Sequence, residues 1–343
     1  MPKVSVLMSN YNTPVGYLKK SIESVLTQTF ADFELVIIND GSTDCSRDVL
    51  YDYANRDGRI RIIENEKNCG LPRSLNRGIE NCQGEYIARM DTDDICYPDR
   101  LQKQVAFMDA HPEYIVSGAW ADVFFDDENN ILKTWTPKIC SQEEYRIRLM
   151  FNSAPLIIHP TAIFRKEFLD KHHLRYPEDL KYKFAEDYKM WTQCIFCGDI
   201  GILEEPVIKY RDEISDNRIT IRHKKEMAQC GFEIQRDQLK QLDIELSQEM
   251  YKYNNQLLMG RKPYDIEYKR WIDLIIKQNR KYAIYSQPVL KELLYERWYN
   301  IVYYGIAYEK STLMRIKYFF SLYSGQKARF VLARINKNKP KSF

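Results

Sequence analysis

Short apolar segments alternate with helical patterns through the first third of the chain. The segment 33–38 is almost uninterruptedly apolar, which is typical of a parallel strand buried on both faces. Leu18, Ile22 and Val25 recur at helical spacing after the first apolar segment. This β-α-β-α-β-α-β order predicts a doubly wound, mostly parallel sheet that binds ligands at the carboxyl ends of its strands. The predicted strands span 4–8, 33–38, 60–63 and 86–88, and the predicted helices cover 15–27, a stretch through 49–53, 73–81 and 98–110.

Three of the predicted strand ends are polar, at 10–12, 40–44 and 91–94. No Gly-x-Gly-x-x-Gly motif follows the first strand, and the sequence has no Walker-type Gly-Lys-Ser/Thr loop. A phosphorylated ligand is therefore expected to be held by a metal ion instead of a glycine-rich loop.

Asp91, Asp93 and Asp94 place three carboxylates within four positions after the last of these strands. Like charges this close repel one another unless a cation neutralises them, and Mg²⁺ and Mn²⁺ prefer oxygen ligands. Because Mg²⁺ usually takes only one or two carboxylates and completes its shell with phosphate oxygens, the pattern indicates a metal bridge to a phosphorylated ligand. The alternative is a solvated turn whose aspartates cap the following helix.

Five segments, in their order and spacing, resemble the family 2 glycosyltransferases of bacterial surface-polysaccharide synthesis. The resemblance covers roughly the first two thirds of the chain. It implies the GT-A fold, an α/β fold with a Rossmann-like, mostly parallel central sheet flanked by helices, which binds a nucleotide sugar. The segments are 4–12, 33–44, 68–79, 84–113 and 185–191.

The resemblance implies that the first strand end and the Asp-Gly-Ser turn hold the nucleoside. Asp40 matches the family's base-binding acid, whose carboxylate would accept a hydrogen bond from the uracil N3–H. Leu75 occupies the position of a common family Arg, which leaves the diphosphate contact of this helix open, with Arg73 as a candidate replacement. The residues expected to contact the nucleotide sugar are Asn10, Tyr11, Asn12, Asp40, Asn68, Gly70, Arg73, Asn76, Arg89, Asp91, Thr92, Asp93, Glu186 and Arg211.

The family's Asp-x-Asp motif binds a divalent cation, Mn²⁺ or Mg²⁺, and Asp91 and Asp93 match it. Asp93 is expected to ligate the ion directly, and Asp91 to contact the ribose or a metal-bound water. Relatives often have a His after the last strand, but Ser215 stands at that position here. His223 and Glu213 are the candidate replacements for this ligand.

Glu186 and Asp187 lie at the start of a predicted helix, where the helix dipole and free backbone N–H groups favour carboxylates. The family match assigns Asp187 as the general base, which takes the proton from an acceptor hydroxyl as that hydroxyl attacks the anomeric carbon. The helix-start position is expected to keep Asp187 ionised. The alternative interpretation is that both acids only stabilise the start of the helix.

The composition is that of an ordinary globular protein, with 44% hydrophobic and 29% charged residues. A net charge of +3 is too small to argue for nucleic-acid binding. The sequence has no run of about 18 apolar residues, so no transmembrane helix is predicted, and the N-terminal strand leaves no room for a signal peptide. The cysteines are expected to be reduced, with Cys194 and Cys197 in a buried helix instead of a zinc site, which predicts a cytoplasmic protein.

Gly and Pro become scarce after Lys224, and apolar residues recur at helical spacing. We expect a GT-A domain over 1–222 and a helical region over 223–343. The final segment, 310–343, interleaves Lys and Arg with aromatic residues, as basic amphipathic helices on anionic bilayers do. One hypothesis is peripheral contact with the cytoplasmic face of the inner membrane, where lipid-linked glycans are assembled. The alternative is that these aromatic residues pack inside the helical bundle.

Together these patterns predict an inverting, metal-dependent glycosyltransferase. A UDP-hexose is the favoured donor, and the acceptor would be a hydroxyl of a glycan or of a lipid-linked oligosaccharide. A nucleotidyltransferase would share the sheet and the metal, but no Gly-rich loop containing Lys or Arg follows the first strand. A non-catalytic sugar-nucleotide or glycan-binding protein would not need Asp187.

Overall fold

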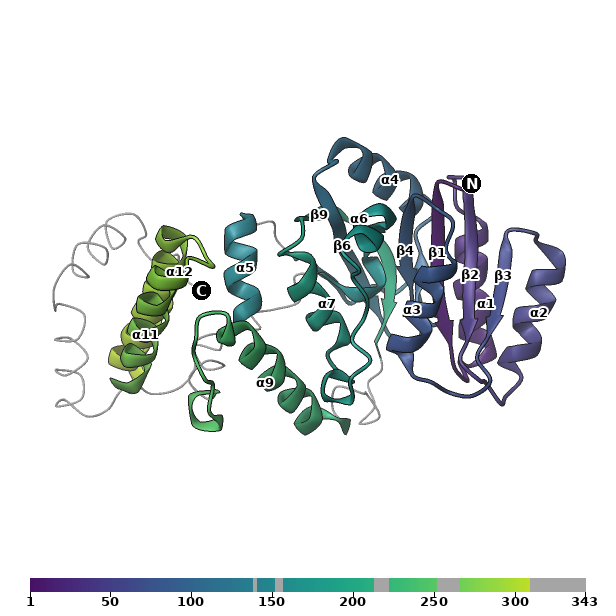
Figure 1. Ribbon diagram of the computed structural model, residues 1–343. Coiled ribbons are helices and arrows are strands. Elements are labelled where there is room, and N and C mark those ends of the chain that lie inside the picture. Colours follow the sequence, from purple (N-terminus) through teal and green to yellow (C-terminus); the bar gives the residue numbers. More distant parts are fainter. Residues whose placement is uncertain (138–140, 152–156, 213–221, 252–265, 309–343) are drawn as a thin grey trace. The chain divides into compact units, whose positions relative to one another are not determined.

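The computed structural model describes the chain except for residues 138–140, 152–156, 213–221, 252–265 and 309–343 (Figure 1). The chain divides into two compact units. The first contains residues 1–142 and 154–231, and the second contains residues 143–153 and 232–343. The basic segment 310–343 and two positions considered for a metal ligand, Glu213 and Ser215, lie outside the described residues.

The first unit opens with parallel strands connected by helices, as the sequence predicts. The strands are β1 (Val4–Asn10), β2 (Phe33–Asn39), β3 (Ile60–Glu64) and β4 (Tyr86–Met90), and the helices are α1 (Val15–Leu26), α2 (Ser46–Arg56), α3 (Leu71–Asn81) and α4 (Arg100–Ala110). β1 lies between β2 and β4, and β3 extends the sheet beyond β2. Every residue of β2 is buried, which agrees with its apolar run.

Beyond β4 the sheet becomes mixed. Its further strands are β5 (Ile95–Cys96), β6 (Tyr114–Phe124), β7 (Lys133–Trp135), β8 (Ile163–Arg165) and β9 (Asp199–Arg211). Among the described residues the strand order is β3-β2-β1-β4-β8-β6-β9-β5, with β7 paired to β6. β8 runs antiparallel to β4 and β6, whereas β9 is parallel to β6. The turn that follows β4 therefore lies where the parallel part of the sheet meets the mixed part.

The turns that follow β2 and β3 pack in direct contact. Gly41 has a φ of +69°, and a Cβ atom at this position would lie 2.5 Å from the carbonyl carbon of Lys67. Only glycine accepts both the left-handed backbone and this close approach. The Asp-Gly-Ser turn is thus fixed against the 67–70 loop.

The remaining helical elements of the first unit are η1 (His159–Thr161), α6 (Lys166–Lys171), η2 (Leu180–Tyr182) and α7 (Glu186–Cys194). Cys194 is buried in α7, and Cys197 is partly buried just beyond its end. Both are free thiols, and neither belongs to a group of potential metal ligands among the described residues. The prediction of a buried helix holds for Cys194, whereas Cys197 lies in the turn after α7 and is only partly buried.

The second unit is helical in its described part, as the sequence predicts for the C-terminal region. α11 (Ile266–Tyr282) and α12 (Gln287–Tyr308) belong to it, and α5 (Gln142–Met150) and α9 (Lys224–Lys240) extend into it. Trp271, Ile275, Leu290 and Leu294 are buried in its hydrophobic core. Within the described residues, no helix has the length and apolar character needed to cross a membrane.

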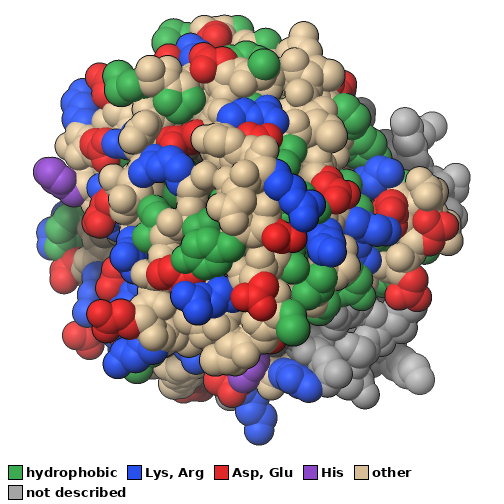
Figure 2. All heavy atoms as spheres, turned by 90° about the vertical axis from the view of Figure 1, so that its right-hand side faces the viewer, with side chains coloured by type: hydrophobic (Ala, Val, Ile, Leu, Met, Phe, Trp, Pro, Cys, Tyr) green, Lys and Arg blue, Asp and Glu red, His purple; other side chains and the backbone are tan. Residues whose placement is uncertain are grey.

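The face of the molecule that carries α2 mixes both signs of charge (Figure 2). Lys and Arg side chains are interspersed with Asp and Glu side chains over this face. This mixture agrees with the small net charge of +3. It gives the face no electrostatic preference for a polyanion.

Arg100 is completely buried at the start of α4. Its guanidinium donates hydrogen bonds to the carbonyl oxygens of Arg89 and Pro160, at 2.7 and 2.9 Å. It also donates to Gln104 Oε1 at 2.9 Å, and Gln104 donates in turn to the carbonyl oxygen of Thr161 at 2.7 Å. Hydrogen bonds from Arg100 and Gln104 of α4 therefore connect the end of β4 with η1 inside the core.

Arg100→Met should lower the free energy of unfolding by about 2–5 kcal/mol, because it leaves two buried carbonyl groups without their donors. Urea unfolding followed by circular dichroism measures the change. Arg56→Met is the matched control, since Arg56 is an exposed arginine of α2 whose partner, Asp52, is also exposed. Equally small losses in both variants would show that the buried network does not stabilise the fold.

Candidate active site

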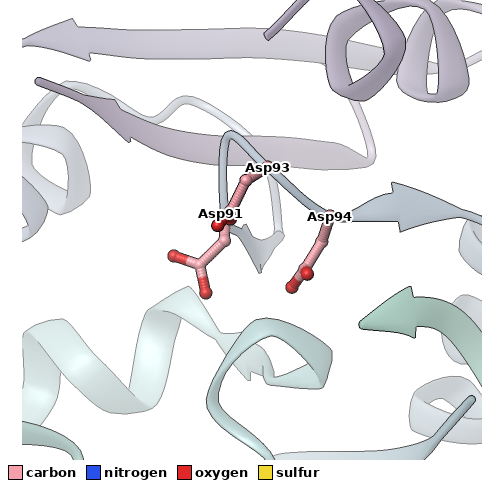
Figure 3. A group of neighbouring side chains, drawn as sticks. All are labelled: Asp91, Asp93 and Asp94. Atoms are coloured by element: carbon pink, nitrogen blue, oxygen red, sulfur yellow. The ribbon is translucent and has the colours of Figure 1, made fainter. Parts of the chain in front are cut away.

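Three carboxylates converge on the turn that follows β4 (Figure 3). One oxygen from each of Asp91, Asp93 and Asp94 lies within 4.8 Å of the others. Figure 3 shows the carboxylates of Asp91 and Asp94 pointing to the same side of the turn. In the part of the chain that the structure describes, this is the one group of three or more side chains with metal-ligand geometry.

Burial and mutual repulsion make full ionisation of these acids unfavourable. Burial, followed by the charge of Asp91, raises the pKa of Asp93 to about 6. Burial, followed by the charges of Asp93 and Asp91, raises the pKa of Asp94 well above its usual value. Arg89 donates a hydrogen bond to Asp91 Oδ2, and the charges of Arg89 and Arg211 favour the ionised form of Asp93, but two guanidinium groups do not balance three carboxylates.

The donor set fits a hard divalent cation such as Mn²⁺ or Mg²⁺. All three ligand atoms are carboxylate oxygens, which these ions prefer. Asp94 Oδ1 accepts a hydrogen bond from the backbone N–H of Arg211 at 2.8 Å. Asp94 Oδ2 is buried and has no hydrogen-bond partner among the described residues. A buried acceptor of this kind lacks a positive partner that a bound cation would supply.

The backbone of the acid turn is fixed by hydroxyl groups from the first part of the chain. Thr92 is buried, and its Oγ1 lies 2.7 Å from Oγ1 of Thr13. Ser21 on α1 donates a hydrogen bond to the carbonyl oxygen of Asp91 at 2.9 Å. The side chain of Thr92, which the sequence suggested for ligand binding, is therefore engaged in holding the turn.

A second acid pair lies at the start of α7. Burial raises the pKa of Glu186 to about 8, and the charge of Asp187 adds to this increase. Burial also raises the pKa of Asp187, although the N–H of Tyr188 donates to its Oδ1 at 2.7 Å and, with the charge of Arg89, favours the ionised form. At neutral pH we therefore expect Glu186 to hold a proton and Asp187 to carry the negative charge. The opposing effect of burial on Asp187 was not visible in the sequence.

One cleft of about 880 Å³ brings both acid groups together. Its size is within the range of small-molecule sites in proteins. Of the residues suggested by the sequence, those lining it are Arg89, Asp91, Asp93, Glu186, Asp187 and Arg211, and Asp94 lines it as well. The cleft wall also contains aromatic residues that no sequence motif indicated, among them Trp135, Phe184 and Tyr210.

Arg89 lies between the two acid groups. Its guanidinium is buried and donates to Asp91, and its charge also favours the ionised form of Asp187. Its Nε is buried without a hydrogen-bond partner among the described residues, and so is Glu186 Oε2. A donor and an acceptor are thus left unpaired in the wall of the same cleft, as expected where a polar ligand binds.

Asn10 and Asn12, which the sequence suggested as nucleoside contacts, form hydrogen bonds with the turn that follows β2. Asn10 is buried, and its amide donates to the hydroxyls of Ser42 and Ser46 at 2.9 and 3.1 Å. Asn12, with a φ of 51°, accepts a hydrogen bond from the N–H of Thr43. Tyr11 is half exposed. The end of β1 is therefore tied to the turn after β2, with the Tyr11 ring on the surface.

Asp40 is almost completely buried and holds the loop that follows β3. Its Oδ1 accepts hydrogen bonds from Asn65 Nδ2 at 2.7 Å and from the N–H of Cys69 at 2.8 Å. Its Oδ2 accepts only the N–H of Gly70, at 2.9 Å, among the described residues. Asn68, between these donors in the chain, is exposed. One oxygen of Asp40 thus retains capacity for a further donor.

Arg73 and Asn76 of α3 contact the segment before α7. The amide of Asn76 exchanges hydrogen bonds with the backbone of Tyr176, at 2.9 and 2.8 Å, and donates to Glu178 Oε1 at 3.0 Å. Arg73 is exposed and pairs with Glu178 at 3.2 Å. In this structure the Arg73 guanidinium is therefore paired with a carboxylate, and the prediction that it contacts a diphosphate remains untested.

Arg211, at the end of β9, is packed between two aromatic rings. Its guanidinium carbon lies 3.9 Å from the ring centroid of Tyr17 and 4.5 Å from that of Phe124. Its Nε donates to the carbonyl oxygen of Asp93 at 3.0 Å. Arg211 therefore supports the acid turn through main-chain contacts while it lines the cleft.

His223 does not belong to the three-carboxylate group. Its ring stacks on Phe184, with centroids 4.2 Å apart, and its Nδ1 lies 3.4 Å from Glu226 Oε1. Phe184 lines the cleft, so His223 lies behind part of the cleft wall. Its suggested role as a metal ligand stays a prediction.

The sheet and cleft are those of an α/β protein with an acid-lined cleft at the carboxyl ends of its strands, where proteins of this class bind ligands. The family model for glycosyl transferase family 2 matches residues 5–172. An uncharacterized glycosyltransferase of Methanocaldococcus jannaschii is 38% identical over 223 residues, which are 64% of this chain and 74% of the relative. The chain belongs to glycosyltransferase family 2, and the protein is a glycosyltransferase.

Two further comparisons extend this similarity. The amylovoran biosynthesis glycosyltransferase AmsE of Erwinia amylovora is 33% identical over 215 residues, covering 60% of this chain and 75% of AmsE. The crystal structure of residues 1–349 of S. aureus TarS in complex with UDP has a TM-score of 0.55 at 20% identity, covering 94% of this chain and 93% of that chain. The GT-A fold predicted from the sequence is confirmed.

Glu186→Gln should preserve turnover at neutral pH and remove a loss of activity above about pH 8, because Gln resembles the protonated acid. In the unaltered protein, ionisation of Glu186 above that pH places a second negative charge beside Asp187. The pH profile of kcat/KM for the donor measures the effect. Glu80→Gln, at an exposed position of α3, is the control. A Glu186→Gln profile with the same alkaline loss would contradict the assignment.

Proposed function

We propose that this protein is an inverting, divalent-metal-dependent glycosyltransferase that moves a hexose from a UDP-sugar to a hydroxyl group of a glycan or lipid-linked acceptor. The observation that carries this proposal is the meeting of two acid groups in one cleft, the turn after β4 and the Glu186–Asp187 pair. The first group suits a diphosphate held through a metal. The second suits proton transfer from an acceptor hydroxyl.

Three observations support a uridine nucleotide as part of the donor. The Asp-Gly-Ser turn and the end of β1 match the family's nucleoside-binding segments, and Asp40 Oδ2 retains capacity for a further hydrogen-bond donor such as the uracil N3–H. A solved structure with the same fold holds UDP. The half-exposed ring of Tyr11 lies at the same strand end and could cover the base.

The acid turn is proposed to bind the diphosphate through Mn²⁺ or Mg²⁺. Bound there, the ion would supply Lewis-acid stabilisation of the departing diphosphate. Asp91, Asp93 and Asp94 all offer carboxylate oxygens, Asp94 is buried, and Asp91 is held in place by Arg89. Burial and mutual repulsion raise the pKa values of Asp93 and Asp94, and a bound cation would offset both effects.

Asp187 is proposed to act as the general base. It removes the proton from the acceptor hydroxyl, whose oxygen forms a bond to the anomeric carbon. The bond between that carbon and the diphosphate oxygen breaks, and its electron pair leaves with the diphosphate. Attack from the face opposite the leaving group inverts the anomeric configuration. A protonated Glu186 can meanwhile donate a hydrogen bond to the sugar without adding negative charge.

The acceptor is proposed to be a growing surface polysaccharide. AmsE, which is 33% identical to this chain, takes part in amylovoran biosynthesis. A cytoplasmic protein that touches the inner membrane through the basic, aromatic segment 310–343 would reach lipid-linked acceptors. A non-catalytic sugar-nucleotide binder is a weaker proposal, because binding alone would not require a buried acid pair opposite the metal turn.

Asp93→Asn should abolish transfer and weaken donor binding, because it removes a carboxylate ligand of the bridging ion. EDTA should have the same effect on the unaltered protein, and added Mn²⁺ should restore activity. Release of UDP from a panel of UDP-sugars measures turnover, and calorimetry measures donor affinity. Asp52→Asn, at an exposed position of α2, should change neither quantity. Full turnover in EDTA and in Asp93→Asn would rule out the metal assignment.

Asp187→Asn should reduce kcat by about 10²–10⁴-fold and leave donor affinity nearly unchanged, since a positioned base typically contributes this factor. The variant keeps the size of the side chain and its place at the start of α7. Rapid-mix turnover with donor binding measured in parallel separates the two effects. Turnover equal to that of the unaltered protein would assign Asp187 to helix stabilisation alone.

A further inference from the structure

Trp135 and Tyr210 form a pair of aromatic rings across strand β6. Trp135 on β7 is the pairing partner of Ala121, and Tyr210 on β9 is the partner of Val123. Alternate residues of a strand share one face of the sheet, so these side chains lie on the same face. Because Ala121 has only a methyl group, the two rings meet above it, with centroids 4.8 Å apart and planes inclined by 45°.

The Trp135 ring is held in position from several sides. One part of it packs against the hydrophobic core of the sheet, and another part lines the cleft. Trp120 donates a hydrogen bond from its indole N–H to the carbonyl oxygen of Pro137 at 3.1 Å, which fixes the chain just after β7. The ammonium group of Lys133 lies 5.4 Å from the Trp135 ring centroid. A half-buried indole that is fixed before a ligand arrives loses little entropy on binding.

Tyr210 connects this ring pair to the acid turn, because it lines the same cleft as Asp91, Asp93 and Asp94. Burial, followed by the charges of these carboxylates, raises the pKa of its phenol. Trp135 is therefore connected to the acid turn through the ring of Tyr210. A pyranose has a polar rim of hydroxyl groups and a face of C–H groups that packs on an aromatic ring, whose face carries partial negative charge. A cleft that offers both carboxylates and a fixed indole suits such a molecule.

The order of the strands indicates which sugar meets Trp135. The proposed nucleoside contacts lie on β1 and β2, and the proposed diphosphate contacts follow β4. β6, β7 and β9 lie on the opposite side of β4 from β1 and β2. β9 pairs along one edge of β6, so β7 lies on the same side of β6 as β8, about one strand spacing, roughly 5 Å, beyond β4. A donor that runs from β1 to β4 would thus have Trp135 beyond its sugar, where a second sugar approaches Asp187.

We propose that Trp135, supported by Tyr210, is the acceptor platform of this enzyme, and that it stacks on the C–H face of a pyranose ring in a glycan acceptor. This inference rests on the proposed function, because it assigns the acceptor side of the same cleft. It adds that the acceptor carries a sugar ring next to the reacting hydroxyl, in contrast to a bare lipid or polyol phosphate.

Saturation-transfer NMR tests the platform without relying on turnover. The full-length protein with UDP and Mg²⁺ is mixed with the methyl glycosides of glucose, galactose, mannose and N-acetylglucosamine. We expect saturation of ring C–H protons in at least one glycoside. Trp135→Leu keeps apolar bulk but removes the aromatic face, and should weaken this binding by about tenfold or more. Trp135→Phe should retain most of it.

The controls separate the platform from general effects. Tyr51→Ala removes a partly exposed aromatic ring of α2 and should leave glycoside binding unchanged. The UDP protons should stay saturated in Trp135→Leu, which also shows that the variant is folded. Glycoside binding that survives Trp135→Leu, or that is absent from the unaltered protein for every glycoside, would overturn the platform.

Two further outcomes have distinct meanings. If Trp135→Leu loses saturation of the sugar protons of a UDP-hexose and keeps glycoside binding, the ring belongs to the donor side and the inference is wrong. If the unaltered protein binds glycosides through Trp135 but neither binds UDP nor releases it from UDP-sugars, the proposed function fails while the sugar platform stands.

Discussion

Buried negative charge at the end of β4 is the constraint on which the rest of the site depends. Three carboxylates occupy four positions, and Asp94 among them is buried, so the fold must supply positive partners. Arg89 binds Asp91 directly, and Arg211 donates from its side chain to the carbonyl oxygen of Asp93 and from its backbone N–H to the carboxylate of Asp94. The compensation is incomplete, as the raised pKa values of the acids show. The negative charge that the two arginines leave unbalanced would favour binding of a cation.

The fold holds this turn through hydrogen bonds to its backbone and to the Thr92 side chain, and leaves Asp94 Oδ2 without a partner among the described residues. Hydroxyl groups of Thr13 and Ser21 fix it from the α1 side, and Arg100 fastens the carbonyl of Arg89 from the core. The same holds at the proposed nucleoside-binding end of β1, where Asn10 donates hydrogen bonds to Ser42 and Ser46. Such ordering lowers the entropy that ligand binding would otherwise cost. Some side chains that the sequence suggested as ligand contacts, such as Asn10 and Thr92, hold the loops of the site in place.

The sequence predicted the parallel half of the sheet because its information is local. Apolar runs such as 33–38 and polar strand ends appear within a few residues of one another, and five ordered segments carry the family resemblance. The mixed half depends on pairings between distant segments, as in β6 with β8 and β9, which no local pattern encodes. The hydrogen bond between Asn76 and Tyr176 could not be predicted for the same reason, because the two residues are far apart in the chain. Trp135 had no motif at all, and only its strand pairing shows that it meets Tyr210.

The two acids at the start of α7 show how similar burial can give neighbouring carboxyl groups different states. Both lose hydration, and the charge of Arg89 favours the ionised form of each, but Asp187 also accepts an N–H from Tyr188, whereas Glu186 Oε2 has no partner among the described residues. At neutral pH we therefore expect the proton on Glu186 and the charge on Asp187. If Asp187 is the base, as proposed, burial favours catalysis, because it raises the basicity of Asp187 while a neutral Glu186 adds no repulsion. The charge of Arg89 favours the ionised form of this proposed base, and Arg89 lies on the strand that ends in the acid turn.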